Sequence, residues 1–200
     1  MRAERKENAR QRLVEALNAY VPVNEQETVD LARMISFLTT GETPFLRTNE
    51  TAHFTASAWI VNPARTKVLM VYHNLYNSWS WTGGHADGEE GLLGVALKEA
   101  REETGIRHIR PVREEPFSVE ILTVNGHEKR GKYVPSHLHY NVTYLVEAEE
   151  SDELRMKPDE NSGVAWFTFE DALKASTEPW MVERVYRKLM DKLRAKVLSG

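Results

Sequence analysis

The sequence contains no cysteine among its 200 residues. The chain therefore cannot form a disulfide, a thiolate metal site or a cysteine nucleophile, and this composition fits a reducing, cytoplasmic location. No apolar run approaches the roughly 18 residues that a membrane helix needs. The polar opening MRAERKENARQR also lacks the apolar stretch of a signal peptide. We therefore expect neither secretion nor a membrane partner.

An excess of positive charge is also missing. Asp and Glu total 30 against 26 Lys and Arg, so the formal net charge is −4. No global positive field is available to hold a polyanion, and we expect no nucleic-acid partner. With 41% hydrophobic and 28% charged residues, the composition is that of an ordinary globular chain.

Apolar periodicity divides the chain into helices and strands. A helix is expected over residues 24–40, because Asn24 and Glu27 form a capping-box-like start and Gly41 follows its end. Alternation and β-forming residues predict strands over 51–61, 67–72, 117–124, 137–146 and 164–169, and helical spacing predicts further helices over 92–104 and 179–198. The mixed order predicts an α/β or α+β fold rather than a helix bundle.

Acidic side chains are concentrated in the segment GGHADGEEGLLGVALKEAREETGI, which holds the main candidates for catalysis. Glu99, Glu102 and Glu103 are spaced i, i+3 and i+4, so a helix places all three carboxylates on one face. Like charges at this spacing destabilise a helix by about 0.2–0.5 kcal/mol per pair, and we therefore expect a cation among them. Clustered carboxylate oxygens suit Mg²⁺ or Mn²⁺ rather than zinc.

Glycines and acids flank this helix at meaningful positions. Gly83 and Gly84 are expected to let the backbone turn sharply, and the carbonyl of Gly84 is a candidate metal ligand. Asp87 and Glu90 stand three residues apart at the expected helix start, as in a cap. Gly105 follows the helix, where a left-handed cap is expected.

The same segment resembles the Nudix box, G x5 E x7 R E U x E E x G U, in which U is a bulky aliphatic residue. The matching positions are Gly84, Glu90, Glu99, Glu102, Glu103, Gly105 and Ile106. So complete a spacing favours metal chemistry over a merely solvated acidic face. Lys98 stands where the family has Arg, and Ala100 where it usually has a larger aliphatic residue. Lysine keeps the positive charge but lacks the planar fork that orients a carboxylate bidentately.

This resemblance implies a Nudix α/β/α sandwich built on a mixed sheet. Residues 42–200 would form the hydrolase domain, and residues 1–41 a helical extension of the kind that often serves as a homodimer surface. The resemblance also implies hydrolysis of a diphosphate linkage in a small-molecule nucleoside diphosphate joined to another group, with Mg²⁺ or Mn²⁺ as cofactor. The ion would bridge phosphate oxygens and lower the pKa of a water that attacks phosphorus.

The resemblance also implies roles for individual residues. Glu99, Glu102 and Glu103 are expected as metal ligands and catalytic groups, one of them doubling as the base, with Lys98 as a further catalytic group. Glu90 is expected to support the site, because capping explains it without metal. Many family members take another carboxylate from a loop outside the box, and Glu160 is the candidate here.

Three histidines are candidates for substrate binding. His137 and His139 share one face of an expected strand, and His85 follows the paired glycines. Two histidines on one strand can ligate a metal, but no third nitrogen or sulfur ligand is evident. We therefore favour a wall of the substrate cleft or hydrogen-bonded core histidines, with His85 either contacting phosphate or supporting its loop.

The sequence allows two alternative functions to be compared with that of a hydrolase. An isopentenyl diphosphate isomerase-like member of the same superfamily would need a cysteine, which the chain lacks. A Nudix-fold module that binds a nucleotide without cleaving it is motivated by Lys98 and by the extra helices, and the intact glutamates argue against it. The pattern does not select one substrate.

Overall fold

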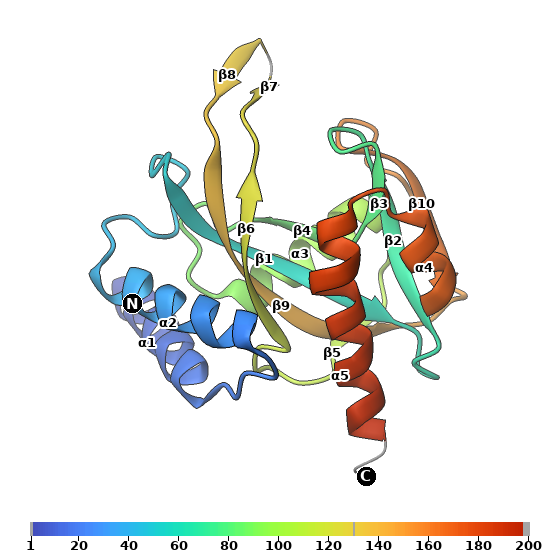
Figure 1. The fold of residues 1–200 in the computed structure, drawn as a ribbon, viewed down its shortest axis with the longest axis horizontal. Helices are drawn as coiled ribbons and strands as arrows, with labels where there is room; N and C mark the ends of the chain where they lie inside the picture. The colour runs from blue at the N-terminus through green and yellow to red at the C-terminus, as the bar shows by residue number, and fades with distance from the viewer. Residues whose placement is uncertain (1, 130, 198–200) are drawn as a thin grey trace. The chain divides into compact units, whose positions relative to one another are not determined.

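The computed structural model describes residues 2–129 and 131–197, so that Met1, Arg130 and residues 198–200, including the expected helix end at Leu198, lie outside it. The chain divides into two compact units: Met1–Ser57, Gly83–Ala96 and Glu114–Tyr144 form the first, and Ala58–Thr82, Leu97–Arg113 and Leu145–Gly200 form the second. Figure 1 labels the helices and strands.

In chain order the elements are α1 (Arg2–Ala19), α2 (Glu25–Thr40), β1 (Ala52–Val61), β2 (Lys67–His73), β3 (Ser78–Ser80), β4 (Thr82–His85), α3 (Leu92–Thr104), β5 (Ile109–Pro111), β6 (Ser118–Val124), β7 (His127–Lys129), β8 (Lys132–Val134), β9 (His137–Ala148), β10 (Asn161–Thr168), α4 (Phe169–Ala175), a π-helical turn (Met181–Tyr186) and α5 (Arg187–Val197). Four elements contribute residues to both units: β1, β4, α3 and β9. The predicted mixture of helices and strands is confirmed.

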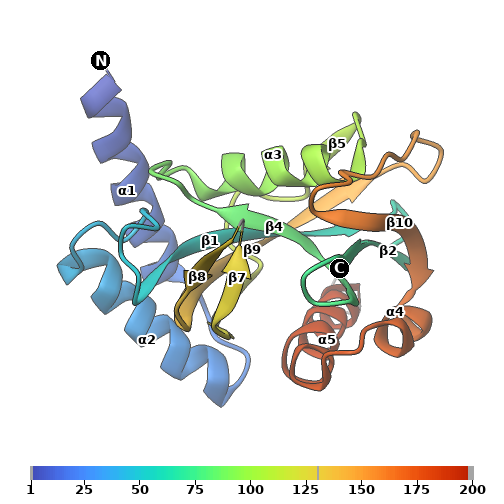
Figure 2. The same ribbon diagram turned by 90° about the horizontal axis from the view of Figure 1, so that it is seen from above.

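In the first unit, α1 and α2 lie side by side in both views, and α2 packs beside β6 (Figures 1 and 2). The Asn24 Oδ1 atom accepts the Glu27 N–H at 2.8 Å, and the Glu27 carboxylate accepts the Val23 N–H at 3.0 Å. These two bonds satisfy N–H groups that the helix itself leaves unpaired. The predicted start of α2 is confirmed, and β6 pairs antiparallel with β9 from Ser118↔Thr143 onward.

In the second unit, β2 is flanked by β1 and β10, and both pairs are antiparallel. The predicted hairpin of β1 and β2 is confirmed by the pairs Ile60↔Leu69 and Val61↔Val68. Trp59 on β1 is fully buried and stacks on Tyr186 at 5.5 Å between ring centroids. This aromatic pair anchors the C-terminal helical segment to the sheet of the unit.

The short elements were not predicted. Strands β3, β4, β5, β7 and β8 have three or four residues each, too few to show an alternation of apolar and polar side chains. The expectation of a sharp turn at Gly83–Gly84 was wrong, because both residues lie in β4. A Cβ atom on Gly83 would lie 2.5 Å from Ser57 Oγ, so the glycine is needed for close strand approach rather than for a turn.

Helix α3 has the predicted bounds, and its end is specified as expected. Gly105 has a φ of 73°, and its N–H donates to the Arg101 carbonyl at 2.9 Å. Asp87 does not cap the helix: it lies in the preceding turn with a φ of 48° and binds Arg47 through two hydrogen bonds of 2.6 and 2.7 Å. No helix in the described part of the chain combines the length and apolar character needed to span a membrane.

The end of α3 generates a prediction about stability. A Cβ atom on Gly105 would lie 2.7 Å from the Arg155 Cβ and 2.9 Å from its backbone nitrogen. Together with the left-handed backbone, this crowding should make Gly105→Ala cost about 1–3 kcal/mol of unfolding free energy. Urea unfolding followed by circular dichroism measures the change.

Gly94 provides the matched control within the same helix. A Cβ atom there would meet no heavy atom within 4 Å. We expect Gly94→Ala to stabilise the protein by about 0.5–1 kcal/mol, because alanine has the higher helix propensity. Equal effects of the two substitutions would contradict the assigned role of Gly105.

Candidate functional site

A cluster of three carboxylates lies in the second unit. Glu99 and Glu103 come from the last turns of α3, and Glu160 from the residue before β10. Each offers one oxygen, and the three oxygens lie within 4.8 Å of one another. Glu103 is 5% exposed, whereas the side chain of Glu99 is 12% and that of Glu160 41% exposed. The cluster therefore has a buried end and an open end.

Asn161 connects the two segments that carry this cluster. Its side-chain amide donates to the Glu103 carbonyl at 2.9 Å, and its Oδ1 accepts the Lys157 N–H at 3.2 Å. The residue is 1% exposed, so these bonds form away from water, where an unpaired amide would be costly. Because β10 begins at Asn161, the same bonds hold the neighbouring Glu160 beside the end of α3.

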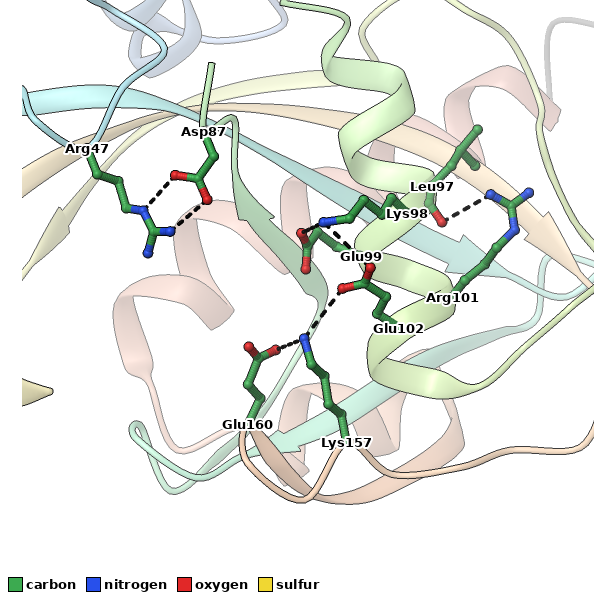
Figure 3. Close-up of polar contacts among 9 residues, drawn as sticks. All are labelled: Arg47, Asp87, Leu97, Lys98, Glu99, Arg101, Glu102, Lys157 and Glu160. Carbon is green, nitrogen blue, oxygen red and sulfur yellow. Dashed lines mark hydrogen bonds and ion pairs between the residues drawn. The ribbon is translucent and has the colours of Figure 1, made fainter. Parts of the chain in front are cut away.

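Two lysines contact the carboxylates of this face (Figure 3). The Lys98 Nζ atom lies 3.2 Å from Glu99 Oε1 and 3.5 Å from Glu102 Oε1. The Lys157 Nζ atom lies 3.0 Å from Glu160 Oε2 and 3.5 Å from Glu102 Oε2. The positive charge that the sequence calls for is thus partly supplied by the protein itself.

The neighbouring carboxylates raise the pKa values of both lysines. The hydrogen bond to Glu99 and the charge of that carboxylate raise the pKa of Lys98. Burial lowers the pKa of Lys157, but its hydrogen bond to Glu160 and the surrounding carboxylate charges outweigh burial and raise the pKa overall. Both ammonium groups therefore stay protonated, and they oppose a further cation near the same oxygens.

Lys98 illustrates what the replacement of arginine changes. Its side chain is 63% exposed, and it contacts Glu99 and Glu102 each through a single nitrogen. A guanidinium could hold one carboxylate through two parallel hydrogen bonds, and an ammonium cannot. Lys98 therefore supplies charge to this face with little control over the orientation of Glu99.

Glu102 differs from the other box glutamates in its surroundings. Its carboxylate contacts both lysines and is 42% exposed, and it does not belong to the three-oxygen cluster found among the described residues. A ligand role for Glu102 stays a prediction. The structure instead brings Glu160 beside Glu99 and Glu103.

The donor set of the cluster fits a hard divalent cation. All three groups offer carboxylate oxygen, with no nitrogen or sulfur among them. Mg²⁺ and Mn²⁺ bind through a few carboxylates and keep several waters, which the open end at Glu160 allows. Zinc would favour nitrogen or sulfur donors.

The remaining predicted site residues lie in the first unit. Gly84 and His85 end β4, and Glu90 precedes α3 with its Oε2 atom enclosed and without a hydrogen-bond partner in the described chain. His85 does not stand alone: its ring centroid lies 4.9 Å from that of His139 and 5.1 Å from that of His53. The roles expected for Gly84 and Glu90 stay predictions.

The three predicted histidines therefore belong to one group with a fourth, His53 of β1. The rings of His137 and His139 have centroids 5.0 Å apart, and each lies 5.0 to 5.1 Å from His53. Burial and the charges of the other imidazoles lower the pKa of His139 to about 2, and burial likewise lowers the pKa of His53. One nitrogen of each ring lies within 4.8 Å of the other three, and substrate binding by His85, His137 and His139 stays a prediction.

Sequence reasoning missed three residues of these sites. Lys157 lies in a loop and Asn161 at the start of β10, and no motif marks either residue, although their closeness to the candidate Glu160 is a usable signal. His53 stands in an apolar strand, where a lone histidine gives no sign of its neighbours. His53 is thus far from His137 and His139 in the sequence, and the fold brings its ring beside theirs.

This chain is similar to known proteins in sequence and in structure. The model of the NUDIX domain family matches residues 51–191. A solved structure of a C. elegans Ap4A hydrolase has a TM-score of 0.50 at 19% identity, covering 74% of this chain and 98% of that one. Among the curated protein sequences, none matches this chain.

Two further solved structures are similar at a lower level. A NUDIX family hydrolase from Clostridium perfringens has a TM-score of 0.48 at 23% identity, covering 70% of this chain and 97% of that one. The E. coli dihydroneopterin triphosphate pyrophosphohydrolase has a TM-score of 0.49 at 14% identity, covering 68% and 92%. The likeness to the C. elegans structure shows a shared fold.

The lysine contacts generate a prediction about metal affinity. Lys157→Gln removes a positive charge that holds Glu160 and opposes a cation at the same oxygens. We expect this variant to bind Mn²⁺ about 1–2 kcal/mol more tightly, a roughly 5- to 30-fold lower Kd. Titration followed by electron paramagnetic resonance measures the free ion.

Lys174→Gln is the control for this experiment. Lys174 pairs with Glu170 on α4 at 2.7 Å and is well exposed. Its loss should leave the Mn²⁺ affinity unchanged. An unchanged or weaker affinity in Lys157→Gln would show that Lys157 does not compete with a cation.

Proposed function

Because this chain belongs to the NUDIX domain family, we propose that it hydrolyses a diphosphate linkage in a nucleoside diphosphate joined to another group, with Mg²⁺ or Mn²⁺ as cofactor. The observation that carries the proposal is the convergence of Glu99, Glu103 and Glu160 to within 4.8 Å. These carboxylates come from the matched box and from a separate loop. A solvated acidic face would not require the loop residue.

The three carboxylates would hold the divalent cation at this face. When bound, the ion would neutralise phosphate charge and lower the pKa of a water molecule that attacks phosphorus. Glu103 is the strongest candidate ligand, because at 5% exposure its charge is least screened by solvent. Glu99 is half-buried beside it, and Glu160 completes the set from the open side.

The reaction also needs a base and a stable arrangement of charge. One P–O bond forms from water, the anhydride P–O bond breaks, and the water proton passes to a carboxylate of the box. Lys98 keeps Glu99 paired at 3.2 Å and limits repulsion between Glu99 and Glu102. Glu102, held by two lysines, remains a further candidate ligand or base.

A nucleotide-binding module without turnover is the second candidate. It is favoured by the single-nitrogen contacts of Lys98, which orient Glu99 less firmly than a guanidinium would. Binding of nucleotides with no product release in the presence of Mg²⁺ would support it. A panel of nucleoside triphosphates, ADP-ribose, sugar nucleotides and dinucleotides, including Ap4A as named for the C. elegans structure, distinguishes the two.

The proposal extends to the domain organisation and location of the protein. We propose that residues 1–41 are a helical extension added to the hydrolase domain of residues 42–200, and that this extension forms a homodimer surface. A chain without cysteine fits a cytoplasmic location.

Loss of the Glu103 carboxylate should abolish most of the activity. Glu103→Gln keeps the size and polarity of the side chain but removes a metal-binding charge, so kcat/KM should fall at least about 100-fold, or roughly 3 kcal/mol. Steady-state kinetics on the best panel substrate measures it, with circular dichroism showing a retained fold.

Glu170→Gln is the control, since Glu170 is an exposed residue of α4 that pairs with Lys174. It should leave kcat/KM within about twofold of the original protein. Near-normal turnover in Glu103→Gln would refute the assignment of the site.

Restoring arginine at the box position tests the role of Lys98. Lys98→Arg should preserve or raise kcat, because a planar fork can hold Glu99 through two hydrogen bonds. The same kinetic assay measures the effect. A large loss of kcat would show that the site geometry depends on lysine.

A further inference from the structure

Four imidazole rings from three strands meet in the first unit. His53 lies on β1, His85 ends β4, and His137 and His139 lie two residues apart on β9. One nitrogen of each ring lies within 4.8 Å of the nitrogens of the other three. None of these residues belongs to the carboxylate cluster of α3.

The strands are held in the register that brings the rings together. Leu138, between the two β9 histidines, donates its N–H to the Thr51 carbonyl at 2.9 Å, and Ala86 donates to the Phe54 carbonyl at 3.2 Å. Both bonds lie one residue from a histidine of the group. The side chain of Asn141 adds a buried contact, because its Oδ1 accepts from the hydroxyls of β1 at Thr55 and Ser57 at 3.0 and 2.9 Å.

Backbone carbonyls orient two of the rings. The Nδ1 of His53 lies 3.0 Å from the Asn49 carbonyl, and the Nδ1 of His137 lies 2.8 Å from the Pro135 carbonyl. A carbonyl only accepts, so Nδ1 carries the proton in each ring, and the neutral ring has its lone pair on Nε2. Metal-ligating histidines commonly donate their other nitrogen to a carbonyl in this way.

One inward nitrogen lacks a partner among the described residues. His53 is 3% exposed, and its Nε2 is buried with no hydrogen-bond partner in that part of the chain. The Nε2 atoms of His137 and His139 lie 3.1 Å apart, so without an ion one ring must donate to the other. A buried acceptor without a donor is unfavourable, and a cation would satisfy these lone pairs together.

We propose that His53, His85, His137 and His139 form a second metal site, which binds a divalent transition ion of the zinc class. Four imidazole nitrogens suit zinc and its neighbours and exclude Mg²⁺, which requires oxygen ligands. The site is distinct in its ligands from the carboxylate cluster proposed to hold the catalytic ion. The proposal does not depend on the hydrolase activity.

The geometry requires only a modest contraction. Tetrahedral zinc with Zn–N bonds of about 2.0–2.1 Å places its ligand nitrogens about 3.3 Å apart. The His137 and His139 nitrogens are already 3.1 Å apart, and the widest pair of the group is within 4.8 Å. Small rotations of the half-buried His85 and His139 rings would close the site.

The proposed site has a structural role. With four protein ligands no coordination position remains open for a substrate, as in structural rather than catalytic zinc sites. A bound ion would cross-link β1, β4 and β9 of the first unit. Burial lowers the pKa of His53 and of His139, and the Arg47–Asp87 pair and His127 are the other charged or titratable groups that act on these two rings.

Cobalt titration of the full-length protein tests the site without relying on turnover. After removal of metals with a chelator, Co²⁺ should bind with the intense visible absorption of tetrahedral coordination. Glu103→Gln should leave this spectrum unchanged, whereas His139→Asn should weaken Co²⁺ binding at least about 100-fold. His108→Asn is the matched control, since His108 is an exposed histidine that pairs with Asp152.

X-ray absorption of the zinc-loaded original protein identifies the ligand atoms of the ion directly. This measurement tests the site even if His139→Asn does not fold. A first shell of imidazole nitrogens supports the proposal. A first shell of oxygen alone overturns it, as does a tetrahedral Co²⁺ spectrum that survives in folded His139→Asn. Loss of that spectrum in Glu103→Gln would also overturn it, because the signal would then come from the carboxylate cluster.

Discussion

Three carboxylates lie beside the end of α3 and repel one another, and the rest of the site depends on how this repulsion is balanced. Glu99, Glu103 and Glu160 present oxygens within 4.8 Å of one another, and Glu103 is almost fully buried. Such an arrangement is unfavourable unless positive charge lies among the oxygens. Lys98 and Lys157 supply part of that charge from the rim, and a divalent cation would supply it at the centre.

The fold holds these carboxylates together at one point of the second unit. Gly105 ends α3 with a left-handed residue that no side chain could occupy without meeting Arg155, and Asn161 holds the start of β10 against the Glu103 carbonyl. The Asn161 bond holds the neighbouring Glu160 close to residues that repel it. Repulsion among three like charges at one site lowers the stability of the folded protein, as is common where proteins bind metals.

Much of this site could be predicted from sequence, because its information is local. The i, i+3, i+4 spacing of the box glutamates fixes them to one helix face, and Gly105 marks the end of the helix by its backbone alone. Asn24 similarly defined the start of α2. Patterns of this kind depend on residues within one or two turns of each other.

The rest could not be predicted because it depends on segments far apart in the chain. The expected turn at Gly83–Gly84 was wrong, since what the glycine avoids is Ser57 on another strand. His53 stands more than eighty residues before His137, and only strand pairing reveals that the two rings meet at 5.0 Å. Lys157 and Asn161 acquire their roles only when β10 lies beside α3.

We propose that the carboxylates of Glu99, Glu103 and Glu160 bind one divalent cation together. A crystal structure of the protein grown with Mn²⁺, with anomalous diffraction recorded for the metal, tests it directly. We expect an anomalous peak within bonding distance of an oxygen of each of the three residues, with the Lys157 ammonium displaced from Glu160. A well-diffracting crystal without a peak at these oxygens, at a saturating Mn²⁺ concentration, would contradict it.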